Sequence, residues 1–241
     1  MTRAAGELMK RVLMVPPQHF AVTYSINPWM GGVVDKEKAM IQWNTLKTAI
    51  EAEGVEVLTL QQHSKLPDMV FVCNSGLVYN DKVFLSKFAH KERTGEQPHY
   101  LNWFKKNAFN VTGDDYTDSR IQELGDFEIV KCELVGDKFY HLDTCFAPLD
   151  ETTALWYPPA FTESTRKEIL RRMPNSIEIN DDEARAFVCN AICVRRTVLS
   201  PIGVGSKTRK TLLDRGFKLI EVDMSEFMKS GGACQCLVLR L

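Results

Sequence analysis

Short apolar segments alternate with amphipathic segments along the whole sequence, and this alternation limits the fold more than any other feature. Residues 11–15 and 55–60 predict buried strands, and residues 35–53 between them place apolar side chains at close to helical spacing. Gly54 follows that helix, where glycine commonly ends one. Predicted strands and helices recur at spacings of roughly four to five dozen residues without a low-complexity linker, which permits a repeat architecture.

Further elements follow from the same patterns. The other predicted helices cover residues 98–109, 163–172 and 206–215. The other predicted strands cover residues 68–78, 154–157, 176–179, 186–188, 192–199 and 217–222. A Gly136-Asp137 turn between residues 127–133 and 138–143 predicts a hairpin. His141 is therefore expected near the end of a strand.

The composition argues against several classes of partner. Of 241 residues, 44% are hydrophobic and 25% are charged, as in ordinary globular proteins. The 30 basic and 31 acidic residues give a net charge of -1 without a long basic run, so we expect a small polar metabolite rather than nucleic acid or a membrane surface. The apolar run 12–15 stops at Pro16-Pro17, before it resembles a signal peptide or a membrane span, which predicts a cytoplasmic protein. Seven cysteines, an odd number without an export signal, predict free thiols.

The final residues combine glycines with thiols. Residues 229–241 contain a glycine pair, then Cys234 and Cys236, and then a short apolar strand. Glycines there permit positive φ angles and close backbone approach, which suits a turn that presents a side chain to a ligand. His141 and Asp143 lie two residues apart and face the same side if their segment is a strand. A thiol, an imidazole and a carboxylate are the groups of nucleophilic catalysis, so these residues are candidate catalytic groups.

Other interpretations use the same residues. Cys234 and Cys236 also fit a terminal strand as small hydrophobic side chains. His141, Cys145, Cys234 and Cys236 offer one imidazole and three thiols, a set that zinc accepts, although Cys-x-Cys is tighter than the usual spacing. A binding module without catalysis is a third interpretation. Asn27 lies either in a packed loop or in the wall of a site.

Four segments occur in a characteristic order. They are Ile26-Asn27-Pro28-Trp29-Met30, Pro67-Asp68-Met69-Val70-Phe71-Val72-Cys73-Asn74-Ser75-Gly76-Leu77-Val78, His141-Leu142-Asp143-Thr144-Cys145-Phe146 and Gly231-Gly232-Ala233-Cys234-Gln235-Cys236. Together they resemble the guanidino-group-modifying (pentein) superfamily, which includes arginine deiminases, dimethylargininases, amidinotransferases and arginine dihydrolases. The likeness spans most of the chain. It implies one catalytic domain over residues 1–241, with the α/β fold of a five-bladed propeller and a central site.

The resemblance also implies roles for particular residues. The family nucleophile lies a few residues past the glycine-rich run, which matches Cys236 rather than Cys234. His141 would protonate the departing amine and later activate water. Asp143 would hold and polarise the guanidinium while the thiolate attacks its central carbon, and loss of ammonia would leave a covalent amidino-thioether. The other implied substrate-binding residues are Asn74, Asn27 and Arg93. This hydrolysis needs no metal and no organic cofactor.

The motifs also bear on the guanidino substrate. His141-Leu142-Asp143 looks more like arginine-processing enzymes than dimethylargininases, whose third position is not acidic. The pairing of Asn27 with Asn74 is similar to arginine dihydrolases, which convert arginine to ornithine, ammonia and carbon dioxide. The alternatives are a dimethylargininase-type hydrolase that releases citrulline and an alkylamine, and a catalytically degraded binding paralogue.

One region departs from the family pattern. Related chains carry a strand with a Gly-rich acidic motif, which supplies the catalytic acid, and then a carboxylate-binding arginine, between the segments matching residues 98–109 and 122–133. Here that region is cut to residues 112–120, so one blade element is expected to be shortened around residues 111–124. Asp114 or Asp115 is the candidate replacement for the acid.

Overall fold

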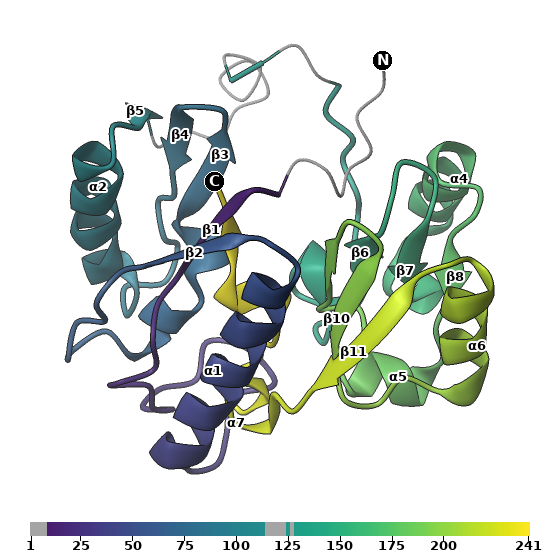
Figure 1. Cartoon of the computed structure of the whole chain (residues 1–241), viewed down its shortest axis with the longest axis horizontal. Coiled ribbons are helices and arrows are strands. Elements are labelled where there is room, and N and C mark those ends of the chain that lie inside the picture. The colour runs from purple at the N-terminus through teal and green to yellow at the C-terminus, as the bar shows by residue number, and fades with distance from the viewer. Residues whose placement is uncertain (1–8, 114–123, 126–127) are drawn as a thin grey trace.

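Figure 1 shows the computed structural model of the chain, in which residues 9–113, 124–125 and 128–241 are described. The described strands form four sheets of three strands each. In every sheet an inner strand runs antiparallel to a middle strand, and a helix then leads to an outer strand parallel to the middle one. Parallel neighbours require such a crossover, so each helix fixes the order of its own strands. Each sheet with its helix is called a module below.

The four modules follow one another along the chain. The first contains β12 (Leu239–Arg240), β1 (Arg11–Met14), α1 (Lys36–Ala52) and β2 (Glu56–Thr59). The second contains β3 (Gly76–Tyr79), β4 (Lys82–Leu85), α2 (Gln97–Lys106) and β5 (Asn110–Gly113). The third contains β6 (Phe146–Pro148), β7 (Ala154–Trp156), α4 (Glu163–Arg172) and β8 (Ile177–Glu178). The fourth contains β9 (Ile192–Val194), β10 (Thr197–Pro201), α6 (Ser206–Asp214) and β11 (Lys218–Val222). Two short helices, α5 (Asp181–Arg185) and α7 (Ser225–Met228), lie in the connections that precede β9 and β12.

Helices begin and end where the sequence supplies caps. The carboxylate of Asp35 accepts a hydrogen bond from the Lys38 backbone N–H at the start of α1, and the hydroxyl of Thr162 caps α4 in the same way. Such caps satisfy N–H groups that the helix itself leaves unpaired, and each is worth about 1 kcal/mol. Gly54, after α1, has a φ of 78°, which glycine adopts without strain. Among the described residues, no helix is both long and apolar enough to cross a membrane.

The first module joins segments from opposite ends of the chain. β12 pairs antiparallel with β1, with Arg240 opposite Val12, and β2 pairs parallel with the other edge of β1, with Val57 opposite Val12. β1 is therefore a central strand, and Leu13 and Met14 beside Val12 are fully buried. The sheet that β1 begins is completed only by the last strand of the chain (Figure 1).

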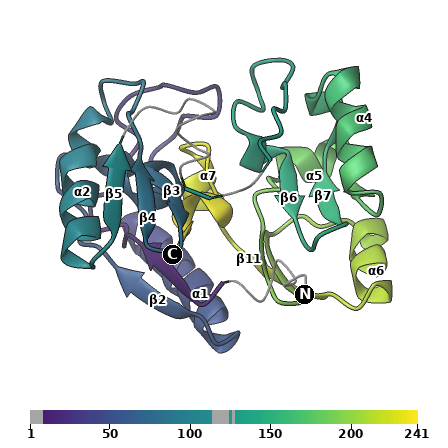
Figure 2. The ribbon, with the colours of Figure 1, turned by 90° about the horizontal axis from the view of Figure 1, so that it is seen from above.

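Hydrophobic side chains form three clusters, each of which joins two modules. The first cluster contains residues of the first and fourth modules, the second joins the third and fourth, and the third joins the first and second. The modules therefore pack in the order second, first, fourth, third. Within residues 9–113, 124–125 and 128–241, no cluster joins the second module to the third, and Figure 2 shows β3, β4 and β5 on the side opposite β6 and β7.

Most of the predicted elements are confirmed. The helices α1, α2, α4 and α6 and the strands β1, β2, β7, β8 and β11 lie within a few residues of their predicted bounds. Residues 192–199 are predicted as one strand, but they contain β9 and the start of β10, which form a hairpin. Arg195 turns the chain there with a φ of 55°.

The strand prediction for residues 68–78 is right only for its last three residues, and the strand at 186–188 and the hairpin are wrong. Residues 68–78 contain the 3₁₀ turns η2 (Pro67–Val70) and η3 (Val72–Ser75) before β3 begins. A short apolar run indicates burial, but its periodicity does not separate a strand from buried turns. Residues 186–188 form a turn in which Phe187 has a φ of 59°. Residues 128–133 and 138–143 form no hairpin: Leu134 bridges to Phe161 instead, and His141 precedes the 3₁₀ turn η5 (Leu142–Thr144).

Candidate active site

The candidate site is built from turns that directly precede the inner strands. Cys73 on η3 lies three residues before β3, Asp143 on η5 lies three residues before β6, and Cys236 on the 3₁₀ turn η7 (Gln235–Leu237) lies three residues before β12. Asn190 lies two residues before β9, in a turn closed by its own N–H and the Phe187 carbonyl at 2.7 Å. Because the modules repeat, their turns meet in one place and bring together residues that are far apart in sequence.

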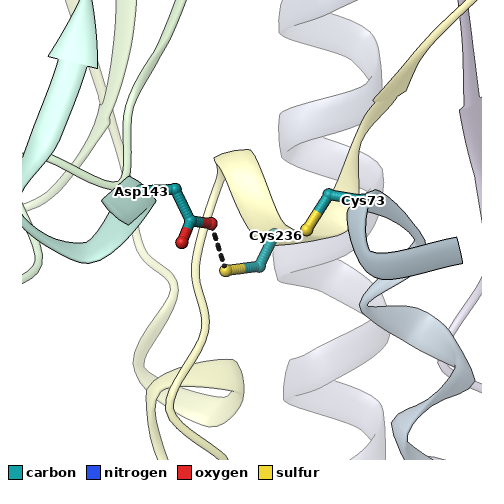
Figure 3. A group of neighbouring side chains, drawn as sticks. All are labelled: Cys73, Asp143 and Cys236. Carbon is teal, nitrogen blue, oxygen red and sulfur yellow. Dashed lines mark hydrogen bonds between the residues drawn. The ribbon is translucent and has the colours of Figure 1, made fainter. Parts of the chain in front are cut away.

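Cys236, Asp143 and Asn190 form a hydrogen-bonded group. The thiol of Cys236 donates to Oδ2 of Asp143 at 3.1 Å, and Figure 3 shows the two side chains pointing toward one another. The side-chain amide of Asn190 donates to Cys236 Sγ at 3.1 Å and to Asp143 Oδ2 at 3.1 Å. Its Oδ1 accepts from the backbone N–H groups of Ala233 and Cys236 at 3.1 and 3.3 Å. Asn190 therefore fixes both the side chain and the backbone of Cys236.

Cys236 is held as a thiol in this environment. The hydrogen bond with Cys73 is the largest cause that raises the pKa of Cys236, and burial and the negative charge of Asp143 raise it further. Cys236 is only 5% exposed, so water stabilises a thiolate poorly there. A protonated sulfur is also what the hydrogen bond to Asp143 requires.

A pocket of about 330 Å³ lies beside this group. Five of the predicted site residues line it: Asn27, Asn74, Arg93, His141 and Cys236. Asp143 reaches the pocket through its contact with Cys236 and itself lines a neighbouring hollow with Leu142 and Arg240. The structure thus brings together all the predicted site residues except Asp114 and Asp115, which lie outside the described residues.

The glycine pair has the geometry that the sequence predicts. Gly231 has a φ of 85°, and a Cβ there would lie 2.7 Å from Asn27 Oδ1 and 2.8 Å from Tyr140 Oη. A Cβ on Gly232 would lie 2.5 Å from the ring of Phe71. Both positions therefore exclude a side chain, and the close approach lets the Asn27 amide donate to the Ser230 carbonyl at 3.1 Å.

Arg93 is almost fully buried in the pocket wall. Its guanidinium donates to both carboxylate oxygens of Glu96, at 2.8 and 2.9 Å, and to Asn74 Oδ1 at 2.8 Å. It also reaches the carbonyls of Asp68 and Phe71 at 3.2 and 3.4 Å. These bonds hold the 3₁₀ turns η2 and η3, the second of which carries Asn74. Direct binding of substrate by Arg93 stays a prediction.

His141 lines the pocket, and the residue as a whole is exposed to solvent. Its carbonyl accepts from the Thr144 hydroxyl at 2.6 Å, which fixes the start of η5. The surrounding protein desolvates the ring and lowers the pKa of His141 more than the negative charge of Asp143 raises it. His141 is therefore mostly neutral at neutral pH in the empty pocket.

The four-residue zinc set is not assembled. Cys234 is buried in the first hydrophobic cluster, and Cys145 is buried in the second, where its thiol donates to the Leu142 carbonyl at 3.5 Å. In the part of the chain that is described, the metal-ligating side chains that gather are instead Cys73, Asp143 and Cys236.

Sequence reasoning missed Asn190, although a signal for it exists. Phe71-Val72-Cys73-Asn74 recurs as Phe187-Val188-Cys189-Asn190, and both copies end two residues before an inner strand. The repeat therefore marks the same turn in two modules. Cys73 and Asp68 were also not assigned to a site; Asp68 accepts from Tyr24 at 2.9 Å and from Ser230 at 3.0 Å.

We expect Asn190→Ala to destabilise the protein by about 2–4 kcal/mol, because it leaves the buried N–H groups of Ala233 and Cys236 without an acceptor. Urea unfolding measures this change. Asn175→Ala is the control, since Asn175 is exposed and far from the turns, and its effect should stay within about 0.5 kcal/mol. Equal stability of the two variants would contradict a fixing role for Asn190.

Comparisons with known proteins identify relatives of this chain. The family model described as eukaryotic N,N dimethylarginine dimethylhydrolase matches residues 31–128. The chain is 58% identical to the uncharacterised protein ZK1307.1 of Caenorhabditis elegans, over 99% of this chain and 96% of that protein. It is 30% identical to an N(G),N(G)-dimethylarginine dimethylaminohydrolase of Mycobacterium tuberculosis, over 96% of this chain and 86% of that protein.

A solved relative is similar in both sequence and structure. The chain is 37% identical to the bifunctional arginine dihydrolase/ornithine cyclodeaminase ArgZ of Synechocystis, of which it spans 37%. The crystal structure of the N-terminal domain of ArgZ with product has a TM-score of 0.91 at 35% identity and covers 95% of this chain and 96% of that domain. That domain has also been solved as a cysteine-to-serine variant bound to substrate and as a variant covalently bound to a reaction intermediate.

The repeated modules, the thiol on the last turn and these similarities define a protein of the pentein superfamily. Within that superfamily, the chain belongs to the family of dimethylarginine dimethylaminohydrolases and arginine dihydrolases. It is shorter than its nematode relative. Their alignment extends over 268 positions, whereas this chain has 241 residues, so the relative has residues at no fewer than 27 positions where this chain has none.

Proposed function

We propose that the protein is a hydrolase that acts on the guanidino group of arginine or a close derivative through a covalent intermediate on Cys236. The observation that carries the proposal is the contact between Cys236 Sγ and Asp143 Oδ2 at 3.1 Å beside a pocket of about 330 Å³. A thiol and a carboxylate at this separation suit a cationic, planar substrate, because the carboxylate holds the guanidinium where the sulfur reaches its central carbon. The covalent intermediate in the related ArgZ domain supports this chemistry.

Substrate binding itself would activate the thiol. In the empty site the negative charge of Asp143 raises the pKa of Cys236. A guanidinium bound to Asp143 cancels that charge and replaces the thiol as hydrogen-bond donor, so both effects favour the thiolate. The thiolate then attacks the guanidino carbon, and one amine nitrogen takes a proton and leaves as ammonia.

His141 is proposed as the group that moves the protons. Its imidazole is mostly neutral in the empty pocket, so it first takes the thiol proton of Cys236 and then gives that proton to the departing nitrogen. The neutral imidazole next takes a proton from the water that attacks the thioether carbon. The carbon–sulfur bond then breaks, and the imidazolium returns this proton to the sulfur, which restores the Cys236 thiol. One cycle converts arginine to citrulline and ammonia. A second cycle on the ureido carbon releases carbon dioxide and ammonia and leaves ornithine.

The leading assignment is arginine dihydrolase activity, with arginine as the substrate. Asn27 and Asn74 both line the pocket, and the ArgZ domain has the same fold with a TM-score of 0.91. Asp143 supplies an acidic group that binds an unsubstituted guanidinium through its N–H groups, two of which dimethylarginine lacks. A dimethylargininase is the alternative. Cytoplasmic location and a single domain over residues 1–241 stay predictions.

A second candidate function, binding of arginine without turnover, follows from the lack of a hydrophobic cluster between the second and third modules within the described residues. Four modules are described, none of the clusters within the described residues joins the second to the third, and the chain lacks at least 27 positions of its nematode relative. A five-bladed arrangement would need a further module between the second and the third. In related chains that region supplies the catalytic acid, for which Asp114 or Asp115 is the candidate replacement here. A catalytically degraded protein that binds arginine without turnover fits this shortening.

One experiment separates these functions. The purified protein is incubated with arginine and, separately, with dimethylarginine, and the products are identified by mass spectrometry. Ornithine without accumulated citrulline supports the dihydrolase, whereas citrulline with dimethylamine from dimethylarginine supports the alternative hydrolase. Calorimetric binding of arginine without any product, and without an adduct on Cys236, would overturn the enzyme proposal and support the degraded binder.

A further inference from the structure

Two thiols meet at the candidate nucleophile. Cys73 on η3 and Cys236 on η7 belong to turns that pack against one another, and their sulfur atoms lie within 4.8 Å of each other and of an oxygen of Asp143. Figure 3 shows Cys73 and Asp143 on two sides of Cys236. All seven cysteines are free thiols in the structure. The position of Cys73 follows from the repeat, since it occupies the same place before β3 that Cys236 occupies before β12.

We infer that Cys73 and Cys236 form a reversible disulfide that blocks the candidate nucleophile. A disulfide joins sulfur atoms about 2 Å apart and Cβ atoms about 4 Å apart. The two sulfur atoms lie within 4.8 Å of one another on packed turns, so the bond needs a further approach of about 3 Å at most, which we expect rotation about the two χ1 angles to supply. Each turn is short and leads directly into a paired strand, so the two sulfur atoms stay close in the folded protein.

The oxidation is balanced with one peroxide molecule. Cys73 is partly exposed, whereas Cys236 is 5% exposed, so peroxide reaches Cys73 first. The Cys73 sulfur takes one peroxide oxygen and becomes a sulfenic acid, and one water is released. Sγ of Cys236 then attacks that sulfur, its proton passes to Asp143 Oδ2 at 3.1 Å, and the hydroxide that leaves takes a proton to become a second water. Two thiols are oxidised and one peroxide is reduced to two waters.

The disulfide would act as a switch on the site. A sulfur bonded to Cys73 cannot attack a guanidino carbon, and attack by a dithiol reductant restores both thiols. Cys73 also protects Cys236, because a sulfur held in a disulfide does not proceed to the irreversible sulfinic acid. Only the loss of turnover depends on the proposed function; the disulfide itself is a property of the two turns.

The test treats the reduced full-length protein with one equivalent of hydrogen peroxide and maps it without reduction. We expect the intact mass to fall by about 2 Da, a peptide that links Cys73 to Cys236, and recovery of at least nine-tenths of any turnover with dithiothreitol. Cys73→Ser should form no such peptide, and when it is given at least two equivalents of peroxide its Cys236 should become sulfinic acid that dithiothreitol does not reduce. Cys132→Ser, which removes another partly exposed thiol, should behave as the wild type.

The mass measurement shows whether the Cys73–Cys236 disulfide forms, even if the protein turns over no guanidino compound. Wild-type protein in which Cys236 becomes sulfinic acid without a link to Cys73, or is linked to a different cysteine, would overturn the inference. The peptide map of the wild-type protein is sufficient for this test. The inference can therefore be refuted even if Cys73→Ser does not fold. Product analysis tests the proposed function separately.

Discussion

Cys236→Ser should lower turnover of arginine by roughly 10⁴-fold or more. A serine hydroxyl loses its proton much less readily than a cysteine thiol, so the variant forms too little of the anion that attacks the guanidino carbon. The serine still fits, since the oxygen is smaller than sulfur and its hydroxyl keeps a donor for Asp143 Oδ2. Arginine binding should therefore persist while the covalent adduct disappears. Rapid-quench product analysis and intact mass spectrometry measure these two effects.

Cys234→Ser is the matched control, two residues away on the same connection. Cys234 is fully buried in the first hydrophobic cluster, so a hydroxyl there costs about 1–3 kcal/mol of stability. Turnover per folded molecule should stay within a few-fold of the wild type, because no contact joins Cys234 to Asp143 among the described hydrogen bonds. Similar losses in both variants would refute the assignment of Cys236.

Asp143→Asn should lower kcat/KM by roughly 10²- to 10³-fold, the cost of losing a charged group that stabilises the reacting cation. The amide keeps the shape of the carboxylate, and its oxygen still accepts from Asn190, so the melting temperature should change little. Removal of the negative charge also lowers the pKa of Cys236, to which Asp143 contributes a rise. Iodoacetamide should therefore alkylate Cys236 faster in the variant at pH 8 than in the wild type.

The two effects of Asp143→Asn have opposite signs, which makes the result specific. If the Cys236 thiol becomes more reactive while turnover falls, the Asp143 carboxylate acts by binding the substrate and not by stabilising the folded protein. A variant that unfolds at lower temperature but keeps its kcat/KM per folded molecule would show that Asp143 only packs beside the thiol. Asp137→Asn, in an exposed turn of the same connection, should change neither rate.

Local patterns were enough to predict the helices α1, α2, α4 and α6 and the strands β1, β2, β7, β8 and β11, but not β4 and β5. α4 was predicted with its cap at Thr162 because one hydroxyl and the following apolar spacing suffice to start a helix. The segment 68–78 is predicted as a strand because it is buried, whereas its conformation depends on bonds from other segments, such as those from the Arg93 guanidinium to the Asp68 and Phe71 carbonyls. Such contacts leave no trace in local periodicity.

The site was predictable where a family motif covers it. Cys236, Asp143 and Asn74 were found in this way, and each lies at or beside the pocket. Asn190 lies in no such motif, and its importance arises only because the fourth module places its turn against that of β12. The repeated Phe-Val-Cys-Asn sequence would have revealed the equivalence of two turns, but not that they face a common centre.

Because β12 completes the first sheet, this sheet forms only late in the synthesis and folding of the chain. A growing chain contains Asn27 and Asn74 early, yet the turn that carries Cys236 is attached to the first sheet only when Leu239 and Arg240 pair with β1. The pairing joins residues separated by nearly the whole sequence, and such contacts form slowly. A partly made or C-terminally clipped chain would thus expose the edge of β1 and lack this attachment, so the proposed nucleophile is held by the first sheet only once the sheet is complete.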